Sequence, residues 1–132
     1  MYLLDTDTLI YFLKGEPEVV RSFRRNVESP MALSVITYGE LVYGAAKSRN
    51  RTQNLAKVLR IAEIYPVVEV SRGVMDLFGS LKADLEKKEA RLDDFDLLIA
   101  STALLLGYRL VTNNERHYRR IPGLDVENWS GS

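Results

Sequence analysis

Cysteine is absent from the 132 residues of this chain, and histidine occurs only once, as His117. The lack of cysteine excludes disulfide bonds and metal sites built on thiolates. Long apolar runs are missing as well: the longest, residues 97–106, is interrupted by Ser101 and Thr102. A membrane helix needs roughly 18 apolar residues, and the first residues lack the pattern of a signal peptide. We therefore expect a cytoplasmic protein that does not associate with membranes.

An excess of charge of either sign is also missing, because 18 basic side chains balance 18 acidic ones. A dedicated nucleic-acid binder is often clearly basic, so this balance does not favour that class. The basic residues are nevertheless grouped, at Lys47, Arg49 and Arg51 and again within residues 116–120. An enzyme with acids in a pocket and bases on its rim would have the same net charge. Composition therefore leaves the function open.

Apolar residues make up 46% of the chain, which is enough for one compact domain with its own core, expected to span residues 1–132. Their spacing predicts strands that alternate with helices. The expected strands are residues 2–4, 31–35, 67–70, 109–112 and 124–129. The expected helices are residues 6–14, 18–26, 37–47, 52–64, 71–85, 93–107 and 115–119. Such alternation predicts an α/β fold with a mainly parallel sheet covered by helices on both faces.

Ligands of such sheets bind beyond the carboxyl ends of the strands, which directs attention to the acids that follow the first strand. Asp5 comes directly after that strand, where it is also well placed to cap the next helix. A cap alone does not explain Asp5 and Asp7 together, since two carboxylates this close repel each other unless a cation or hydrogen-bond donors compensate.

Further polar residues lie at other predicted element boundaries, and each has an ordinary structural interpretation. Glu40 has the Thr-x-x-Glu spacing of a capping box with Thr37, although Gly39 beside it also suits close approach of a ligand. Asp96 is one of three acids in the first turn of an apolar helix, where acids suit the helix dipole. Residues 112–114, Thr-Asn-Asn, form either a turn or a source of neutral oxygen ligands.

The combination of these residues indicates more than each of them does singly. The predicted sheet brings several of them to one edge, and carboxylates with at most one histidine favour a hard cation such as Mg²⁺ or Mn²⁺. Metals held in this way promote hydrolysis of phosphodiesters. Phosphodiester hydrolysis is therefore the chemistry that this set of residues favours.

These residues carry a resemblance that extends over essentially the whole chain. The motifs are Leu-Leu-Asp-Thr-Asp at 3–7, Ser34 to Gly44 around Glu40, Asp96-Leu-Leu-Ile-Ala-Ser, Leu-Val-Thr-Asn-Asn at 110–114, Ile-Pro-Gly-Leu at 121–124 and Glu-Asn-Trp at 127–129. In this order and spacing they resemble the PIN-domain nucleases, specifically the VapC toxins of toxin–antitoxin pairs. The resemblance implies a three-layer α/β/α domain that cleaves structured RNA, often tRNA or ribosomal RNA, with Mg²⁺ or Mn²⁺.

The resemblance also implies residue roles and partners. Asp5 and Asp96 correspond to the principal metal ligands, Glu40 to a third acid that acts through a coordinated water or as a proton acceptor, and Thr112 to a residue that holds the acids by hydrogen bonds. A homodimer and a VapB-type antitoxin are the implied protein partners. Two departures leave the roles of Asp7 and Asn114 open: the family more often has Asn at position 7, and many members have an acid at position 114.

The remaining polar and aromatic residues receive more general assignments. Arg116, Arg119 and Arg120 are candidates for RNA backbone contacts, because arginine binds phosphate through two hydrogen bonds, and we expect His117 to lie on the same solvated surface. The aromatic residues Tyr11, Phe12, Tyr38 and Tyr43 line a partner-peptide groove or belong to the core. We expect Trp129 to anchor the last strand by packing.

Other functional classes fit the sequence less well or are not separated by it. A haloacid-dehalogenase phosphatase shares Asp5-x-Asp7 but needs a threonine where Leu9 stands, and a receiver domain needs a Lys after Lys88, where none occurs. A degenerate PIN domain that binds RNA or antitoxin without cleavage remains an alternative, as does a PIN nuclease of RNA maturation.

Overall fold

The structure is a computed structural model and describes residues 1–131; residue 132, which the expected domain includes, lies outside the described residues. All strand pairs in these residues are parallel, in the order β3-β2-β1-β4-β5. The strands are β1 (Tyr2–Leu4), β2 (Met31–Ser34), β3 (Val67–Val68), β4 (Arg109–Val111) and β5 (Val126–Glu127). The prediction of an α/β fold around a parallel sheet is therefore confirmed.

The helices follow the predicted ranges closely at most positions. They are α1 (Thr6–Leu13), α2 (Pro17–Arg25), α3 (Val35–Ala46), α4 (Arg51–Ile64), α5 (Arg72–Lys87), α6 (Asp94–Leu106) and α7 (Glu115–Tyr118). The predicted caps at Ser71 and Gly107 are confirmed: the Ser71 side chain accepts a hydrogen bond from the backbone N–H of Val74, and Gly107 has a left-handed conformation with φ of 70°. The last strand is shorter than predicted, because only Val126 and Glu127 pair with β4.

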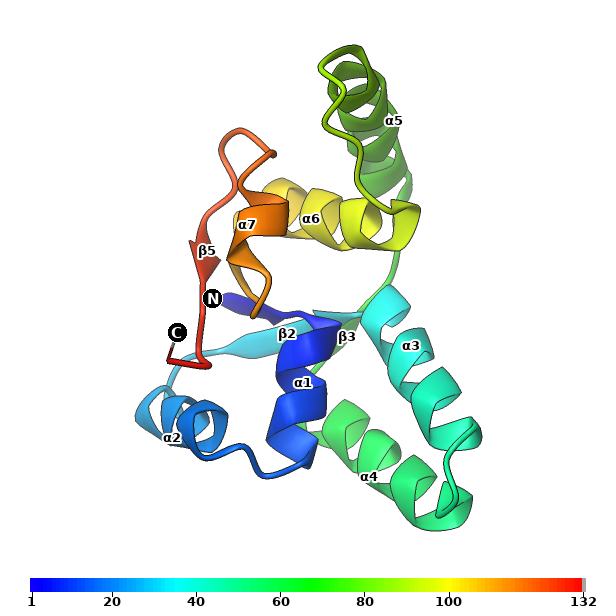
Figure 1. The fold of residues 1–132 in the computed structure, drawn as a ribbon, viewed down its shortest axis with the longest axis vertical. Helices are drawn as coiled ribbons and strands as arrows, with labels where there is room; N and C mark the ends of the chain where they lie inside the picture. The colour runs from blue at the N-terminus through cyan, green and yellow to red at the C-terminus, as the bar shows by residue number, and fades with distance from the viewer. Residues whose placement is uncertain (132) are drawn as a thin grey trace.

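Helices cover both faces of the sheet, with α5, α6 and α7 on one side and α1, α2 and α4 on the other (Figure 1). Successive strand residues point to opposite faces, so Leu3 and Leu4 enter two different core clusters. The same alternation separates Leu110 from Val111. Two cores on either side of one sheet confirm the three-layer α/β/α architecture that the resemblance implies.

Trp129 anchors the end of the chain, as predicted. Its indole is 4% exposed and contacts the rings of Tyr2 and Phe23 edge-on, at centroid distances of 5.2 Å and 5.0 Å. This contact holds the segment after β5 against β1 and α2.

The order of the strands locates the site. The central strand β1 has β2 on one side and β4 on the other, so the connections from its carboxyl end and from the carboxyl ends of its neighbours diverge around one crevice. Asp5 directly follows β1, Val35 begins α3 directly after β2, and Thr112 directly follows β4. Within residues 1–131, no helix combines the length and the apolar character that crossing a membrane would require.

Candidate active site

Asp5 lies at the end of β1 and is held by donors from two directions. Its Oδ1 accepts a hydrogen bond of 2.8 Å from the backbone N–H of Thr6, which makes Asp5 the N-cap of α1. Its Oδ2 accepts one of 2.8 Å from the Thr112 hydroxyl, at the end of β4. The structural and the functional interpretations of Asp5 are therefore compatible, because the cap occupies only part of the acceptor capacity of the carboxylate.

The burial of Asp5 has an electrostatic consequence. The residue is only 5% exposed, and this burial, together with the negative charge of Asp7 and to a lesser extent that of Asp96, raises the pKa of Asp5 to about 7. The hydrogen bonds from Thr112 and Thr6 oppose this shift. Burial also raises the pKa of Asp7, against hydrogen bonds from the backbone N–H of Asn113 and from Thr8. The end of β1 thus concentrates negative charge in a place with little solvent.

Glu40, on α3, is connected to this corner through Thr6. The Thr6 hydroxyl donates a hydrogen bond of 2.6 Å to Glu40 Oε1 and lies 3.1 Å from the Thr37 hydroxyl. The capping-box interpretation of Thr37 and Glu40 is wrong, because Ser34 is the N-cap of α3 and its side chain accepts from the backbone N–H of Ile36. Glu40 is therefore free of a capping role and turns toward α1.

Asp96, in the first turn of α6, faces a partner that the sequence did not reveal. Its Oδ2 lies 2.9 Å from His117 Nε2, and both side chains are partly exposed, at 30% and 23%. The expectation that His117 lies among the arginines on a solvated surface is therefore wrong: α7 turns its imidazole toward Asp96. Asp93 occupies the N-cap position of α6 as expected but makes no side-chain capping hydrogen bond.

The three arginines proposed for RNA contacts are exposed beside this site. Arg119 forms an ion pair of 3.3 Å with Glu115, and Arg120 donates to the carbonyl oxygen of Arg91 at 2.8 Å. Asn114 is the N-cap of α7 without a side-chain capping bond, and its backbone N–H donates to the Thr112 hydroxyl at 3.1 Å. Asn114 thus supports the acids indirectly, through the orientation of Thr112.

Whether a divalent cation fits depends on this donor set. No group of three His, Asp or Glu side chains within residues 1–131 is gathered tightly enough to enclose a cation as it stands. The charges nevertheless converge, since Asp7 and Asp96 both raise the pKa of Asp5. Carboxylate oxygens are the ligands that Mg²⁺ and Mn²⁺ prefer. The residues present therefore fit a hard cation between Asp5 and Asp96.

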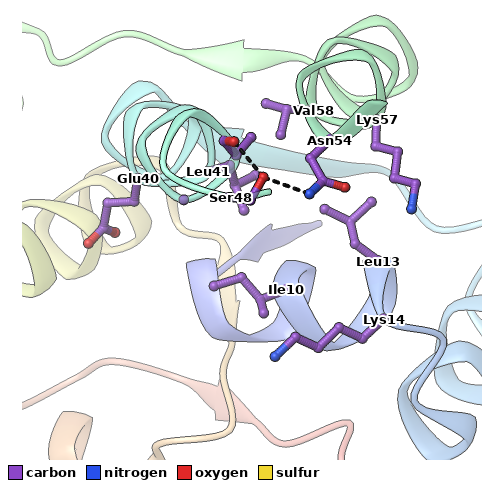
Figure 2. Close-up of a pocket in the computed structure, with 11 residues that line it drawn as sticks. Ile10, Leu13, Lys14, Glu40, Leu41, Ser48, Asn54, Lys57 and Val58 are labelled. Atoms are coloured by element: carbon purple, nitrogen blue, oxygen red, sulfur yellow. Dashed lines mark hydrogen bonds between the residues drawn. The ribbon is translucent and has the colours of Figure 1, made fainter. Parts of the chain in front are cut away.

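A hollow lies along α1 and α3, and Glu40 lines it. Figure 2 shows one part of it, where Ile10 and Leu13 of α1 face Leu41 and Val58, with Glu40 at one side. A second part shares Ile10, Glu40 and Gly44 with the first and extends to Tyr43 and Phe95.

Two exposed aromatic rings border the second part of this hollow: Tyr43 is 65% exposed and Phe95, next to Asp96, is 51% exposed. Four aromatic residues were expected to line a groove or to belong to the core. Tyr43 lines the hollow and Tyr11 is 39% exposed without lining either part of it. Phe12 and Tyr38 pack against the core, with the Phe12 ring tilted against that of Phe23 at a centroid distance of 4.2 Å.

The fold is that of a PIN domain, and the model of the PIN domain family matches residues 2–124. The chain is 34% identical to Ribonuclease VapC2 of Rickettsia felis, with 98% of each chain covered. It is 36% identical to the tRNA(fMet)-specific endonuclease VapC of Salmonella typhimurium, with 97% of each covered. The chain therefore belongs to the PIN-domain family and, within it, to the VapC group.

Solved structures agree with this assignment. The crystal structure of VapBC2 from Rickettsia felis, bound to a DNA fragment from its promoter, superposes with a TM-score of 0.90 at 32% identity and covers 97% of this chain and 98% of its own. The DNA-bound VapBC structure from Salmonella typhimurium also has a TM-score of 0.90, at 36% identity, with 97% of each chain covered.

Proposed function

We propose that this protein is a metal-dependent endoribonuclease, the toxin of a VapBC-type pair, that hydrolyses phosphodiester bonds in structured RNA such as tRNA or ribosomal RNA. The observation that carries the proposal is the convergence of the Asp5, Asp7 and Asp96 carboxylates at the carboxyl end of the central strand, where the charges of Asp7 and Asp96 raise the pKa of Asp5. Relatives that align over nearly the whole chain are named ribonucleases, and the Salmonella relative is named for cleavage of tRNA(fMet).

Each acid has a distinct task in this proposal. Asp5 and Asp96 hold Mg²⁺ or Mn²⁺, which supplies Lewis-acid polarisation of the phosphodiester. Glu40, oriented by the Thr6 hydroxyl, accepts the proton of the attacking nucleophile. Thr112 fixes the rotamer of Asp5 by its hydrogen bond. Asp7, whose charge raises the pKa of Asp5, strengthens the attraction of the site for a cation.

Side chains around the acids position the RNA. Arg116, Arg119 and Arg120 are exposed beside α7, where they contact phosphates of the substrate next to the site. Such contacts with phosphate add affinity without sequence preference. Arg116 contributes most, because Arg119 is shared with Glu115 and Arg120 with the carbonyl oxygen of Arg91.

The apolar hollow along α1 and α3 is the site for the antitoxin. The neighbouring structures are VapBC complexes, and a VapB-type antitoxin is the partner that we propose for this chain. An apolar peptide segment from it occupies the hollow between Ile10, Tyr43 and Phe95, which places the segment across Glu40 and blocks the access of RNA. We also propose a homodimer as the assembled form of the chain.

Cleavage of purified RNA tests the proposal. Total RNA and tRNA are incubated with the protein in Mg²⁺, in Mn²⁺ and in EDTA, with Asp96→Asn and Asp94→Asn as matched variants. Asp94 lies two residues away on the same helix and pairs with Lys82 at the surface, so it controls for the loss of one acid in this turn. We expect discrete metal-dependent products from the wild type and from Asp94→Asn, and none from Asp96→Asn.

Two other results would contradict the proposal in different ways. Equal cleavage by Asp96→Asn would indicate a contaminating ribonuclease and would remove Asp96 from the site. Absence of cleavage by a folded wild-type protein that binds metal would favour the catalytically degenerate PIN module that binds RNA or antitoxin.

A further inference from the structure

Tyr118, in α7, carries a hydroxyl that its packing does not explain. The residue is 1% exposed and belongs to the core cluster between the sheet and α6. Its hydroxyl oxygen is fully buried and has no hydrogen-bond partner within residues 1–131. A buried polar group without a hydrogen-bond partner destabilises the folded state. A phenylalanine would fill the same space without this cost, so the hydroxyl calls for a separate explanation.

The surroundings of this hydroxyl are the acids of the site. Burial and then the negative charges of Asp5, Asp96 and Asp7 raise the pKa of Tyr118, and Asp5 is the carboxylate toward which its O–H is directed. The phenol therefore stays protonated and acts only as a donor toward these acids. The hydroxyl meets no acceptor by strict hydrogen-bond geometry in this structure, and Asp5 is the side chain whose hydrogen bonding contributes to its raised pKa.

Asp5 has an acceptor position to offer. A carboxylate has about four acceptor positions, and the Thr6 N–H and the Thr112 hydroxyl each occupy one, on different oxygens. A donor from Tyr118 would occupy a third position and leave one for a cation. The orientation of Asp5 would then be fixed from the α1 side, from β4 and from α7.

We propose that Tyr118 is a positioning residue of the active site, whose hydroxyl donates a hydrogen bond to the Asp5 carboxylate in the cation-loaded state. This inference rests on the proposed metal-dependent function and deepens it. The unpaired hydroxyl is a cost that the metal-free protein bears, and cation binding relieves it. Partners of this kind in metal sites typically change metal affinity about 10- to 100-fold when they are removed.

The test compares Tyr118→Phe with Tyr108→Phe in the full chain. Tyr108 is a partly buried tyrosine that packs against the same core cluster, so it controls for the loss of a tyrosine hydroxyl from this layer. Affinity for Mn²⁺ is measured from the EPR signal of the free ion, and the melting temperature is measured in EDTA. We expect about tenfold weaker Mn²⁺ binding by Tyr118→Phe, with an equal or higher melting temperature, and no change in Mn²⁺ binding by Tyr108→Phe.

The other outcomes separate this inference from the function on which it rests. Wild-type affinity in Tyr118→Phe overturns the role of Tyr118 alone. A lower melting temperature with unchanged Mn²⁺ affinity also overturns it, because the hydroxyl would then serve the fold. Failure of the wild type to bind Mn²⁺ overturns the metal-dependent function together with this inference.

A measurement on the wild type covers the case in which Tyr118→Phe does not fold. The ¹³C resonance of the Tyr118 Cζ atom should shift when Mg²⁺ is added, because its hydroxyl gains an acceptor. An unchanged resonance at saturating Mg²⁺ overturns the inference.

Discussion

The two halves of the candidate site are held in different ways. Asp5 follows a central strand, is 5% exposed and receives two hydrogen bonds of 2.8 Å from the backbone of α1 and from the end of β4. Asp96 lies in the first turn of a helix, its side chain is 30% exposed, and it contacts the imidazole of His117. The strand half is therefore fixed by the fold, whereas the helix half has room to move.

This difference assigns the two halves different contributions to cation binding. In the strand half, the ionised form of Asp5 is unfavourable, since burial and the charge of Asp7 raise the pKa of Asp5 to about 7. This half provides a carboxylate that is already oriented. We expect the helix half to adjust more when an ion binds, because the Asp96 side chain is less buried and its contact is with another side chain, His117.

Substitution in the fixed half should have the largest effect. Asp5→Asn keeps a side-chain oxygen that can cap α1, but it removes the charge that faces the cation. Because a metal ion contributes several kcal/mol of transition-state stabilisation, we expect single-turnover RNA cleavage to fall about 10³-fold. Asp76→Asn, an exposed acid on α5, is the control and should cleave as the wild type does. A loss of less than tenfold would assign the cation to other ligands.

The burial of Asp5 should make the stability of the protein depend on pH. The pKa of Asp5 is raised from 3.8 to about 7 in the folded protein, so between these values the folded state holds more protons than the unfolded state. Stability in EDTA should therefore fall as pH rises from about 4 to about 7, by up to about 4 kcal/mol.

Urea denaturation at a series of pH values measures this contribution. In Asp5→Asn the fall should be much smaller, because the titrating group is gone. Saturating Mg²⁺ should also reduce it, since a cation stabilises the charged carboxylate. A wild-type stability that does not change across this range would contradict the electrostatic description of the fixed half.

Loss of the hydrogen bond between Thr6 and Glu40, which connects the two halves, should reduce cleavage less than loss of the Asp5 charge does. Thr6→Val removes the hydroxyl that donates to Glu40 Oε1 but preserves the shape of the side chain. Because one hydrogen bond to a charged group contributes about 1.5–3 kcal/mol, we expect cleavage to fall at least about tenfold, with Mn²⁺ affinity unchanged. Thr6→Ser restores the hydroxyl and should restore the rate. If Thr6→Val cleaves RNA as fast as the wild type does, the hydrogen bond from Thr6 does not orient Glu40 for catalysis.

Most of the fold follows from local sequence patterns. Apolar runs at 2–4 and 109–112, helical spacing in α1 and α5, and caps at Ser71 and Gly107 are local signals, and the structure agrees with them within a few residues. The strand order was not predictable in the same way, because it depends on which strands pair after long connections. The alternating pattern over residues 124–129 predicted a longer last strand than β5, in which only Val126 and Glu127 pair with β4.

The site could be predicted in its parts but not in its contacts. Asp5, Glu40 and Asp96 stood out because acids at element boundaries are unusual in such number. The contact between His117 and Asp96 was not visible, because three neighbouring arginines suggest a solvated surface and only the direction of α7 places the imidazole inward. From the sequence, Tyr118 is likewise expected to be an ordinary core residue. Only the structure shows that its hydroxyl is close enough to the acids for their charges to raise its pKa.

We propose that Asp5 and Asp96 together hold the cation, and the anomalous diffraction of crystals grown with Mn²⁺ tests this most directly. We predict a manganese peak between the carboxylates of Asp5 and Asp96, with oxygen ligands at about 2–2.3 Å and with Thr112 still bonded to Asp5. A peak that contacts neither of these residues, or its absence from crystals at saturating Mn²⁺, would contradict the claim.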